Sequence, residues 1–180
     1  MKPLIITIAV VIIYSFTLVF TEDYRQAQRN EYRVKYACEE LSASGSLFYD
    51  QEEFGEGNEV FNTEEGIKAI RDQIPNLLSV DSNLKPSSNS YWSEPIEYKV
   101  YFYDDSGICK VYKNGRKEKE FSFRYGDRHK DDWVSYDPYI TDPTVVVTIN
   151  AGPARFRGEL FEDEIPDIIR SASHEWEERY

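Results

Sequence analysis

The feature that most constrains this 180-residue chain is an uncharged, mostly aliphatic run near its N-terminus. The run extends from Leu4 to Phe20, and Lys2 is the only charged residue before Glu22. A helix of 17 residues is about 26 Å long, close to the thickness of the hydrocarbon core of a bilayer. No later stretch is comparably apolar. The sequence therefore predicts one apolar N-terminal helix that carries one polar domain.

A membrane anchor and a cleaved signal peptide both begin in this way. The apolar run is longer than the usual signal core, and the nearest pair of small residues, Val19 and Thr21, makes a poor cleavage site. We therefore predict that residues 1–21 form an uncleaved transmembrane anchor and that residues 22–180 form one extracytoplasmic α+β domain, with a cleaved signal as the alternative. Lys2 favours a single-pass protein of the cell membrane with its N-terminus in the cytoplasm, although Arg25 and Arg29 on the other side weaken this bias.

Charge and cysteine content exclude several classes of partner and site. The chain has 33 Asp and Glu against 21 Lys and Arg, for a formal net charge of −12. Phosphates are repelled by such a chain, so we expect no nucleic acid and no anionic headgroup as a direct partner. The only cysteines are Cys38 and Cys109. Two cysteines make neither a disulfide framework nor a zinc site, although they could form one bridge.

The residues after the apolar run continue a helical pattern. Between Thr21 and Tyr49 there is no Pro, and the only Gly is Gly45, so we predict one helix from about Leu4 to Tyr49. Its buried stripe has spacings of four and three and alternates small with large side chains, which favours close approach of a partner at the small positions. The stripe consists of Val34, Cys38, Leu41, Gly45 and Phe48.

The middle of the chain predicts one further helix between irregular segments. Residues 50–62 form an acidic loop, and Asn62 with Glu65 resembles a capping box. Ile67, Ile70 and Ile74 then follow at helical spacing, so we expect a short amphipathic helix that ends at Pro75. Residues 79–95 are rich in Ser, Asn and Pro and are predicted to be a linker.

From Ile96 onward the hydrophobic period becomes two, which predicts an antiparallel sheet. We expect strands over residues 96–102, 108–113, 117–125 and 144–150. For the second hairpin we predict a three-residue loop, Asn114 to Arg116, that pairs Cys109 with Phe121 and Lys110 with Glu120. Phe102, Cys109 and Phe121 would then share the face that packs on the helix, so both cysteines are expected in one core.

The C-terminal tail predicts a surface helix. Acidic residues and Pro166 follow Glu162, and Ile168, Ala172 and Trp176 lie at intervals of four. The complete prediction is an α+β fold in which a long N-terminal helix, its first half transmembrane, packs on an antiparallel β-sheet.

No pattern in the chain points to catalysis, and we predict no catalytic, cofactor-binding or metal-binding residues. His129 and His174 do not stand at a metal-ligand spacing, and Ser173-His174-Glu175 cannot form a relay from adjacent helical positions. The acidic clusters in residues 50–56, 104–105 and 127–132 match no calcium loop and are expected to be solvated turns. Arg155 and Arg157 would pair with Glu159 and the acidic tail, or with an acidic neighbouring subunit.

The order of elements resembles that of type IV pilin-like proteins, in which an N-terminal helix with an apolar first half precedes a short helix and an antiparallel sheet. Residues 32–48 (YRVKYACEELSASGSLF) resemble the small-residue helix that follows the anchor in minor pseudopilins of tight-adherence pilus systems. Residues 143–152 (PTVVVTINAG) resemble a late sheet strand of such proteins. The chain departs from prepilins in having no Gly before Leu4 and no acidic residue between Leu4 and Thr21, which leaves processing of its N-terminus open.

The resemblance implies a structural subunit of a surface pilus or secretion apparatus, with other pilin-like or apparatus subunits as partners through the N-terminal helix. The alternative is a membrane-anchored extracytoplasmic binding or sensory domain unrelated to pili. The first function requires the anchor helix to continue unbroken into the domain, whereas the second would tolerate a flexible hinge between Thr21 and Arg29.

Overall fold

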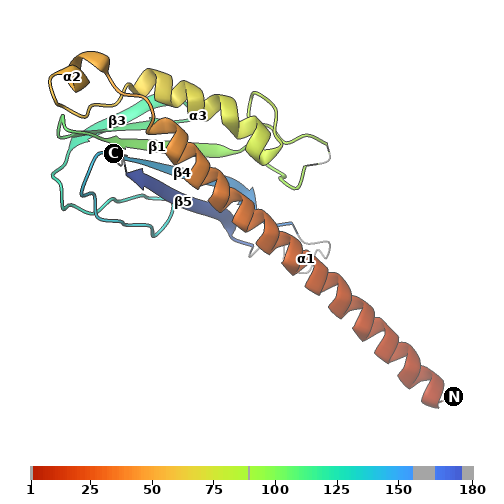
Figure 1. Ribbon diagram of the computed structural model, residues 1–180. Coiled ribbons are helices and arrows are strands. Elements are labelled where there is room, and N and C mark those ends of the chain that lie inside the picture. The colour runs from red at the N-terminus through yellow and green to blue at the C-terminus, as the bar shows by residue number, and fades with distance from the viewer. Residues whose placement is uncertain (1, 89, 156–164, 176–180) are drawn as a thin grey trace, which may run out of the picture.

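The fold consists of one long helix, two shorter helices and a five-stranded sheet (Figure 1). The computed structural model describes residues 2–88, 90–155 and 165–175. Its elements are α1 (Lys2–Gly45), α2 (Gln51–Gly55), α3 (Thr63–Leu78), β1 (Glu97–Tyr103), β2 (Ile108–Lys113), β3 (Arg116–Ser122), β4 (Thr144–Pro153) and β5 (Asp167–Glu175).

Helix α1 is continuous over 44 residues, a length of about 66 Å. The predicted continuity through Thr21 is confirmed, because no Pro or Gly interrupts the hydrogen-bond ladder before Gly45. The helix ends four residues earlier than predicted, and Ser46 N donates to Ser42 O at its last turn. Only the second half of α1 lies on the sheet, and the first half projects away from the domain (Figure 1).

The sheet is antiparallel throughout, with strand order β3-β2-β1-β4-β5. Alternate residues of its central strands face two separate cores, as the period of two predicts. One face packs on α1 and α3 through Tyr98, Val100 and Phe102 of β1. The other face, which includes Tyr101 and Tyr103, is covered by residues of the irregular segment 123–142.

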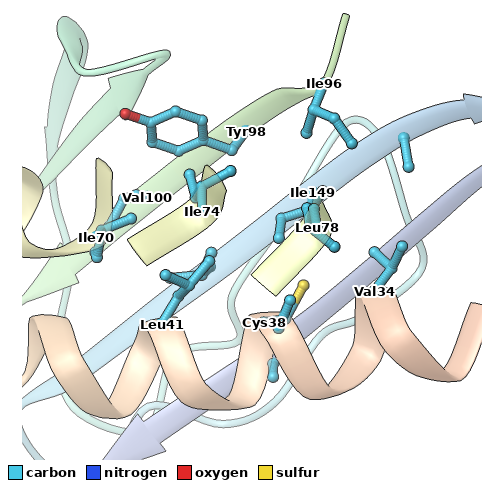
Figure 2. Packing of buried hydrophobic residues seen from close by; sticks show 14 of the residues in the cluster. Val34, Cys38, Leu41, Ile70, Ile74, Leu78, Ile96, Tyr98, Val100 and Ile149 are labelled. Atoms are coloured by element: carbon cyan, nitrogen blue, oxygen red, sulfur yellow. The ribbon is translucent and has the colours of Figure 1, made fainter. Parts of the chain in front are cut away.

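The helix-side core joins α1, α3 and the sheet (Figure 2). Val34, Cys38 and Leu41 are fully buried there, as predicted, whereas Phe48 is half-buried. Close approach at Gly45 is also confirmed, because a Cβ at this position would lie 2.8 Å from Ile70 Cδ1. The apolar face of α3 completes the core, with Ile67, Ile70, Ile74 and Leu78 buried.

Helix α3 begins as predicted but continues beyond Pro75. Asn62 is its N-cap, and its side chain accepts a hydrogen bond from Glu65 N. The prediction that Pro75 ends the helix is wrong, because the last turn runs to Leu78 and its free carbonyls find tertiary donors. Arg33 donates to Leu77 O, and Trp92 Nε1 donates to Leu78 O. Trp92 is buried, so the segment predicted as a linker is a packed connection.

The C-terminal segment is a strand, and the predicted surface helix from Glu162 is wrong over the described residues 167–175. Strand β5 pairs with β4 from Thr144↔Glu175 to Pro153↔Asp167. A spacing of four fits a strand as well as a helix, and Ile168 and Ala172 lie buried on the same face of β5. Trp176 and residues 162–164 of that prediction lie outside the described residues.

The second hairpin has the predicted register but not the predicted loop. Cys109 pairs with Phe121 and Lys110 with Glu120, as expected. The turn is the two-residue Asn114-Gly115, whose φ angles of 51° and 77° are those that a type I′ hairpin turn requires. The odd residue is taken up by a bulge, because Val111 pairs with Lys119 while Tyr112 pairs with Lys117.

The two cysteines lie on opposite faces of the sheet, so the expectation of a shared core is wrong. Phe102 pairs with Lys110 and faces the helices, which turns the adjacent Cys109 toward Tyr103 and the other core. Both cysteines are buried, as predicted, and both are free thiols.

Candidate functional site

The first half of α1 is the most distinctive surface of the molecule. Leu4, Ile5 and Phe16 are each more than 60% exposed, and no part of the apolar window of this helix is buried. Among the described residues, α1 is the one helix long and apolar enough to cross a membrane. A contiguous exposed apolar surface of this size is typical of sites that contact a membrane or another protein.

The Ser and Thr hydroxyls of the apolar half are satisfied within the helix itself. The hydroxyl of Thr7 donates to Pro3 O, that of Ser15 to Val11 O, and that of Thr17 to Ile13 O. Each bond spans four residues, so the hydroxyl needs no water. This half of α1 can therefore enter an apolar environment at little cost from its Ser and Thr hydroxyl groups.

The second half of α1 is fixed to the domain by polar bonds as well as by its apolar stripe. Arg33 donates to Leu77 O and Ser79 Oγ, both at 2.7 Å. On β5, the Arg170 guanidinium forms an ion pair with Glu31, and Arg170 O accepts from Cys38 Sγ. Burial raises the pKa of the Cys38 thiol far above its usual range, so this group stays a neutral donor. These bonds hold α1 to α3 on one side and to β5 on the other.

A groove with a volume of about 340 Å³ lies along the surface where α1 meets the end of α3. Its floor is apolar, and two arginines stand beside two tyrosines that are 59% and 67% exposed. We call it the Tyr–Arg groove; its lining residues are Arg29, Tyr32, Arg33, Tyr36, Ala37, Glu40 and Leu77.

His129 is a buried structural residue. Its Nδ1 lies 2.8 Å from the hydroxyl of Tyr103, and its ring meets that of Tyr101 edge-on. Burial lowers the pKa of His129 to about 4, although Asp131 and Asp137 act in the opposite direction. At neutral pH His129 is thus a neutral ring by which segment 123–142 packs on β1.

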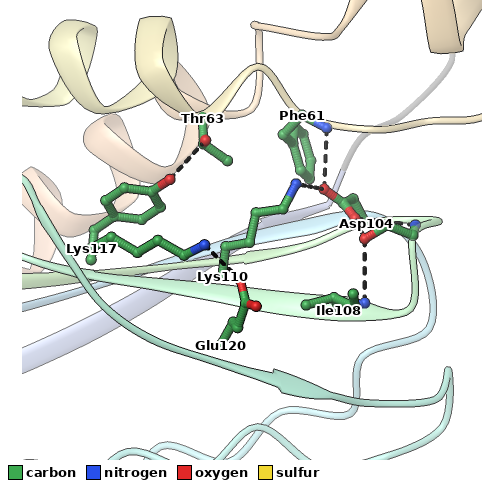
Figure 3. A network of polar contacts seen from close by, with 9 residues as sticks. Phe61, Thr63, Asp104, Ile108, Lys110, Lys117 and Glu120 are labelled. Atoms are coloured by element: carbon green, nitrogen blue, oxygen red, sulfur yellow. Dashed lines mark hydrogen bonds and ion pairs between the residues drawn. The ribbon is translucent and has the colours of Figure 1, made fainter.

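The acidic pair Asp104-Asp105 joins the first hairpin to the segment before α3, and Figure 3 shows the contacts of Asp104. Asp104 is fully buried, accepts a hydrogen bond from Phe61 N and lies 3.6 Å from Lys110 Nζ. Asp105 accepts from Glu59 N and from the hydroxyl of Tyr125. The carboxylate oxygens of this pair thus hold the segment before α3 and Tyr125 to the first hairpin. The expectation of a solvated turn is wrong for Asp104, which is fully buried.

The other acidic clusters have structural contacts too. Asp50 caps α2, accepting from Glu52 N and Glu53 N. Asp131 accepts from Thr148 on β4, and Asp132 lies 3.8 Å from Lys99 Nζ. Over the described ranges, no three His, Cys, Asp or Glu side chains are grouped so that they could hold a metal ion.

The remaining candidate residues do not form a site. Ser173, His174 and Glu175 lie consecutively on β5, where neighbouring side chains point to opposite faces. The backbone N–H of Arg155 donates to the hydroxyl of Tyr91, and its guanidinium donates to Ser90 O. Arg157 and Glu159, and with them the predicted pairing, lie outside the described residues.

No family model, curated protein or solved structure matches this chain. The candidate functional surfaces are therefore defined by geometry alone: the exposed apolar half of α1 and the Tyr–Arg groove. The first was predicted from the sequence. The groove was missed because its lining from outside α1 is Leu77, which lies beyond the predicted end of α3.

Proposed function

We propose that this chain is a membrane-anchored, pilin-like structural subunit of a surface pilus or secretion apparatus. In this proposal residues 1–21 cross the cell membrane with the N-terminus in the cytoplasm, and residues 22–180 form an extracytoplasmic domain. The observation that carries the proposal is one unbroken helix whose first half is fully exposed and whose second half is packed on a sheet (Figure 1).

The mechanical coupling between anchor and domain supports a structural role. A subunit that leaves the membrane and enters a filament must transmit force from its apolar helix to its domain. At the start of the packed half of α1, Glu31 is bonded to Arg170 of β5 and Arg33 is bonded to the end of α3. A sensory domain on a tether has no need for this rigid junction.

The apolar surface supports the same role. The side chains from Leu4 to Phe20 can be covered by lipid acyl chains in the membrane and by equivalent helices of neighbouring subunits in a filament. Both environments are apolar, so transfer between them changes the hydrophobic free energy little. The partners of the proposal are therefore other pilin-like or apparatus subunits, and the proposal includes no enzymatic step.

The two candidate functions differ in whether they need a continuous helix. Gln28 is exposed on α1 between the apolar half and the packed stripe, so Gln28→Pro would kink the helix there without removing a core side chain. Gln28→Ala keeps the helix and serves as the matched control. The measurement is the amount of each variant in sheared surface filaments and in membranes.

We expect Gln28→Pro to remain in the membrane fraction and to be lost from sheared filaments, while Gln28→Ala behaves as the unaltered chain. A proline variant that enters filaments as efficiently as the alanine variant would argue against the proposal. So would the complete absence of the unaltered chain from sheared filaments, which would favour the membrane-anchored binding or sensory domain.

A further inference from the structure

A second surface of the chain is complementary to the Tyr–Arg groove. Residues 50–59 contain five acidic side chains and no basic one, and residues 51–58 are all exposed. At the centre of this segment Phe54, on α2, is 47% exposed. We call residues 50–59 the acidic tip, because they lie at the end of the domain farthest from the apolar half of α1 (Figure 1).

The Tyr–Arg groove is complementary to the acidic tip in both charge and apolar surface. Its floor of Ala37 and Leu77 with two exposed tyrosine rings can receive an aromatic side chain. Arg33 has only uncharged partners in its two hydrogen bonds, Leu77 O and Ser79 Oγ, so its positive charge is available to an incoming carboxylate. The pair of Arg29 with Glu22 is exposed on both sides and is readily exchanged.

From these observations we infer that the acidic tip of one copy docks in the Tyr–Arg groove of a second copy, with Phe54 on the apolar floor and the carboxylates of Glu52 and Glu53 beside Arg29 and Arg33. The inference rests on the proposed function, which it deepens by naming a contact between domains. It is separate from the contact between apolar helices.

The positions of the two surfaces determine what the contact builds. Arg33 lies about 18 Å along the axis of α1 from Gly45, and the acidic tip lies beyond that end of the helix. One surface is therefore near the start of the packed half and the other is at the far end of the domain. A contact between two different surfaces is heterologous, and it builds an open assembly when the rotation between copies does not close a ring. Because the two surfaces lie at different heights along α1, each contact moves the next copy along the helix direction, as a filament requires.

Cysteine cross-linking in membranes tests the inference with the full chain. The double variant Phe54→Cys with Tyr36→Cys places thiols on the two surfaces, while the native Cys38 and Cys109 are buried. The matched control is Phe54→Cys with Lys35→Cys, because Lys35 is exposed on the same helix but does not line the groove. Val10→Cys reports contact between apolar helices independently.

We expect a ladder of cross-linked dimers, trimers and larger species for the Tyr36 pair, and at least fivefold less for the Lys35 pair. Reversing the charges at Glu52 and Glu53 to Lys should remove the ladder, and the further change Arg29→Glu, which leaves the bonds of Arg33 to the end of α3 intact, should restore it in part.

Four outcomes overturn the inference. Equal ladders for the two pairs would show that the contact is not specific. Cross-linking of Tyr36→Cys alone, without Phe54→Cys, would show that two grooves face each other. Cross-linking at Val10→Cys without the Phe54–Tyr36 ladder would overturn the docking contact alone, whereas absence of both would contradict the proposed function as well.

Discussion

Truncation of Leu41 tests how strongly α1 is bound to the domain. Leu41 is fully buried among α1, α3 and the sheet (Figure 2). Leu→Ala changes in such sites cost about 2 to 5 kcal/mol, so we expect Leu41→Ala to lower the free energy of unfolding by about 3 kcal/mol. With a urea m-value of about 2 kcal/mol per molar for a domain of this size, the midpoint should fall by about 1.5 M.

The assay is urea unfolding of the full chain in detergent micelles, followed by the fluorescence of its three tryptophans, of which Trp92 is buried in the core with Leu41. Leu47→Ala is the matched control, because Leu47 lies just beyond the same helix and is 73% exposed. We expect it to change the unfolding free energy by less than about 0.5 kcal/mol. If the two variants had equal midpoints, α1 would not be part of the core and the rigid junction would be refuted.

Three further predictions concern packing, protonation and thiol chemistry. Gly45→Val should lower the free energy of unfolding in urea by about 1 to 3 kcal/mol, because the new side chain would meet Ile70 and Val145. Gly55→Val is the control, because the space around Gly55 is open and the core should be retained. Equal midpoints for the two variants would refute the close approach at Gly45. The depressed pKa of His129 means that the unfolded chain takes up a proton first as the pH falls below 6.5, so stability should decrease toward pH 4. Between pH 7.5 and 5.0 the loss should be about 2 kcal/mol, and His129→Gln should show that much less pH dependence over the same interval. Burial raises the pKa of Cys109 to about 12 and that of Cys38 further, so neither thiol should react with a disulfide reagent until the chain is unfolded; rapid labelling of the native chain would contradict this burial.

The elements that sequence patterns predicted well were those in which local and tertiary preferences agree. The absence of breakers predicted α1, alternation predicted β1 and β2, and a run of β-branched residues predicted β4. The tail was mispredicted because the interval from Ile168 to Ala172 fits both periods, and pairing with β4 decides between them. Local sequence contains no information about that partner.

Tertiary contacts also explain the remaining differences. The last turn of α3 forms beyond Pro75 because Arg33 and Trp92, both distant in sequence, donate hydrogen bonds to its carbonyls. The position of Cys109 depended on the register between β1 and β2, and an error of one residue moves a side chain to the other face. The Tyr–Arg groove could not be predicted, since it requires the true end of α3 and the packing of α3 beside α1.

The most direct test of the central claim is the intact mass of the chain recovered from membranes and from sheared surface filaments of the same cells. The account predicts the same chain in both fractions, with residues Leu4 to Phe20 present in each. A chain that begins near Glu22 in either fraction, or one confined to the membrane while filaments are recovered without it, would contradict the account.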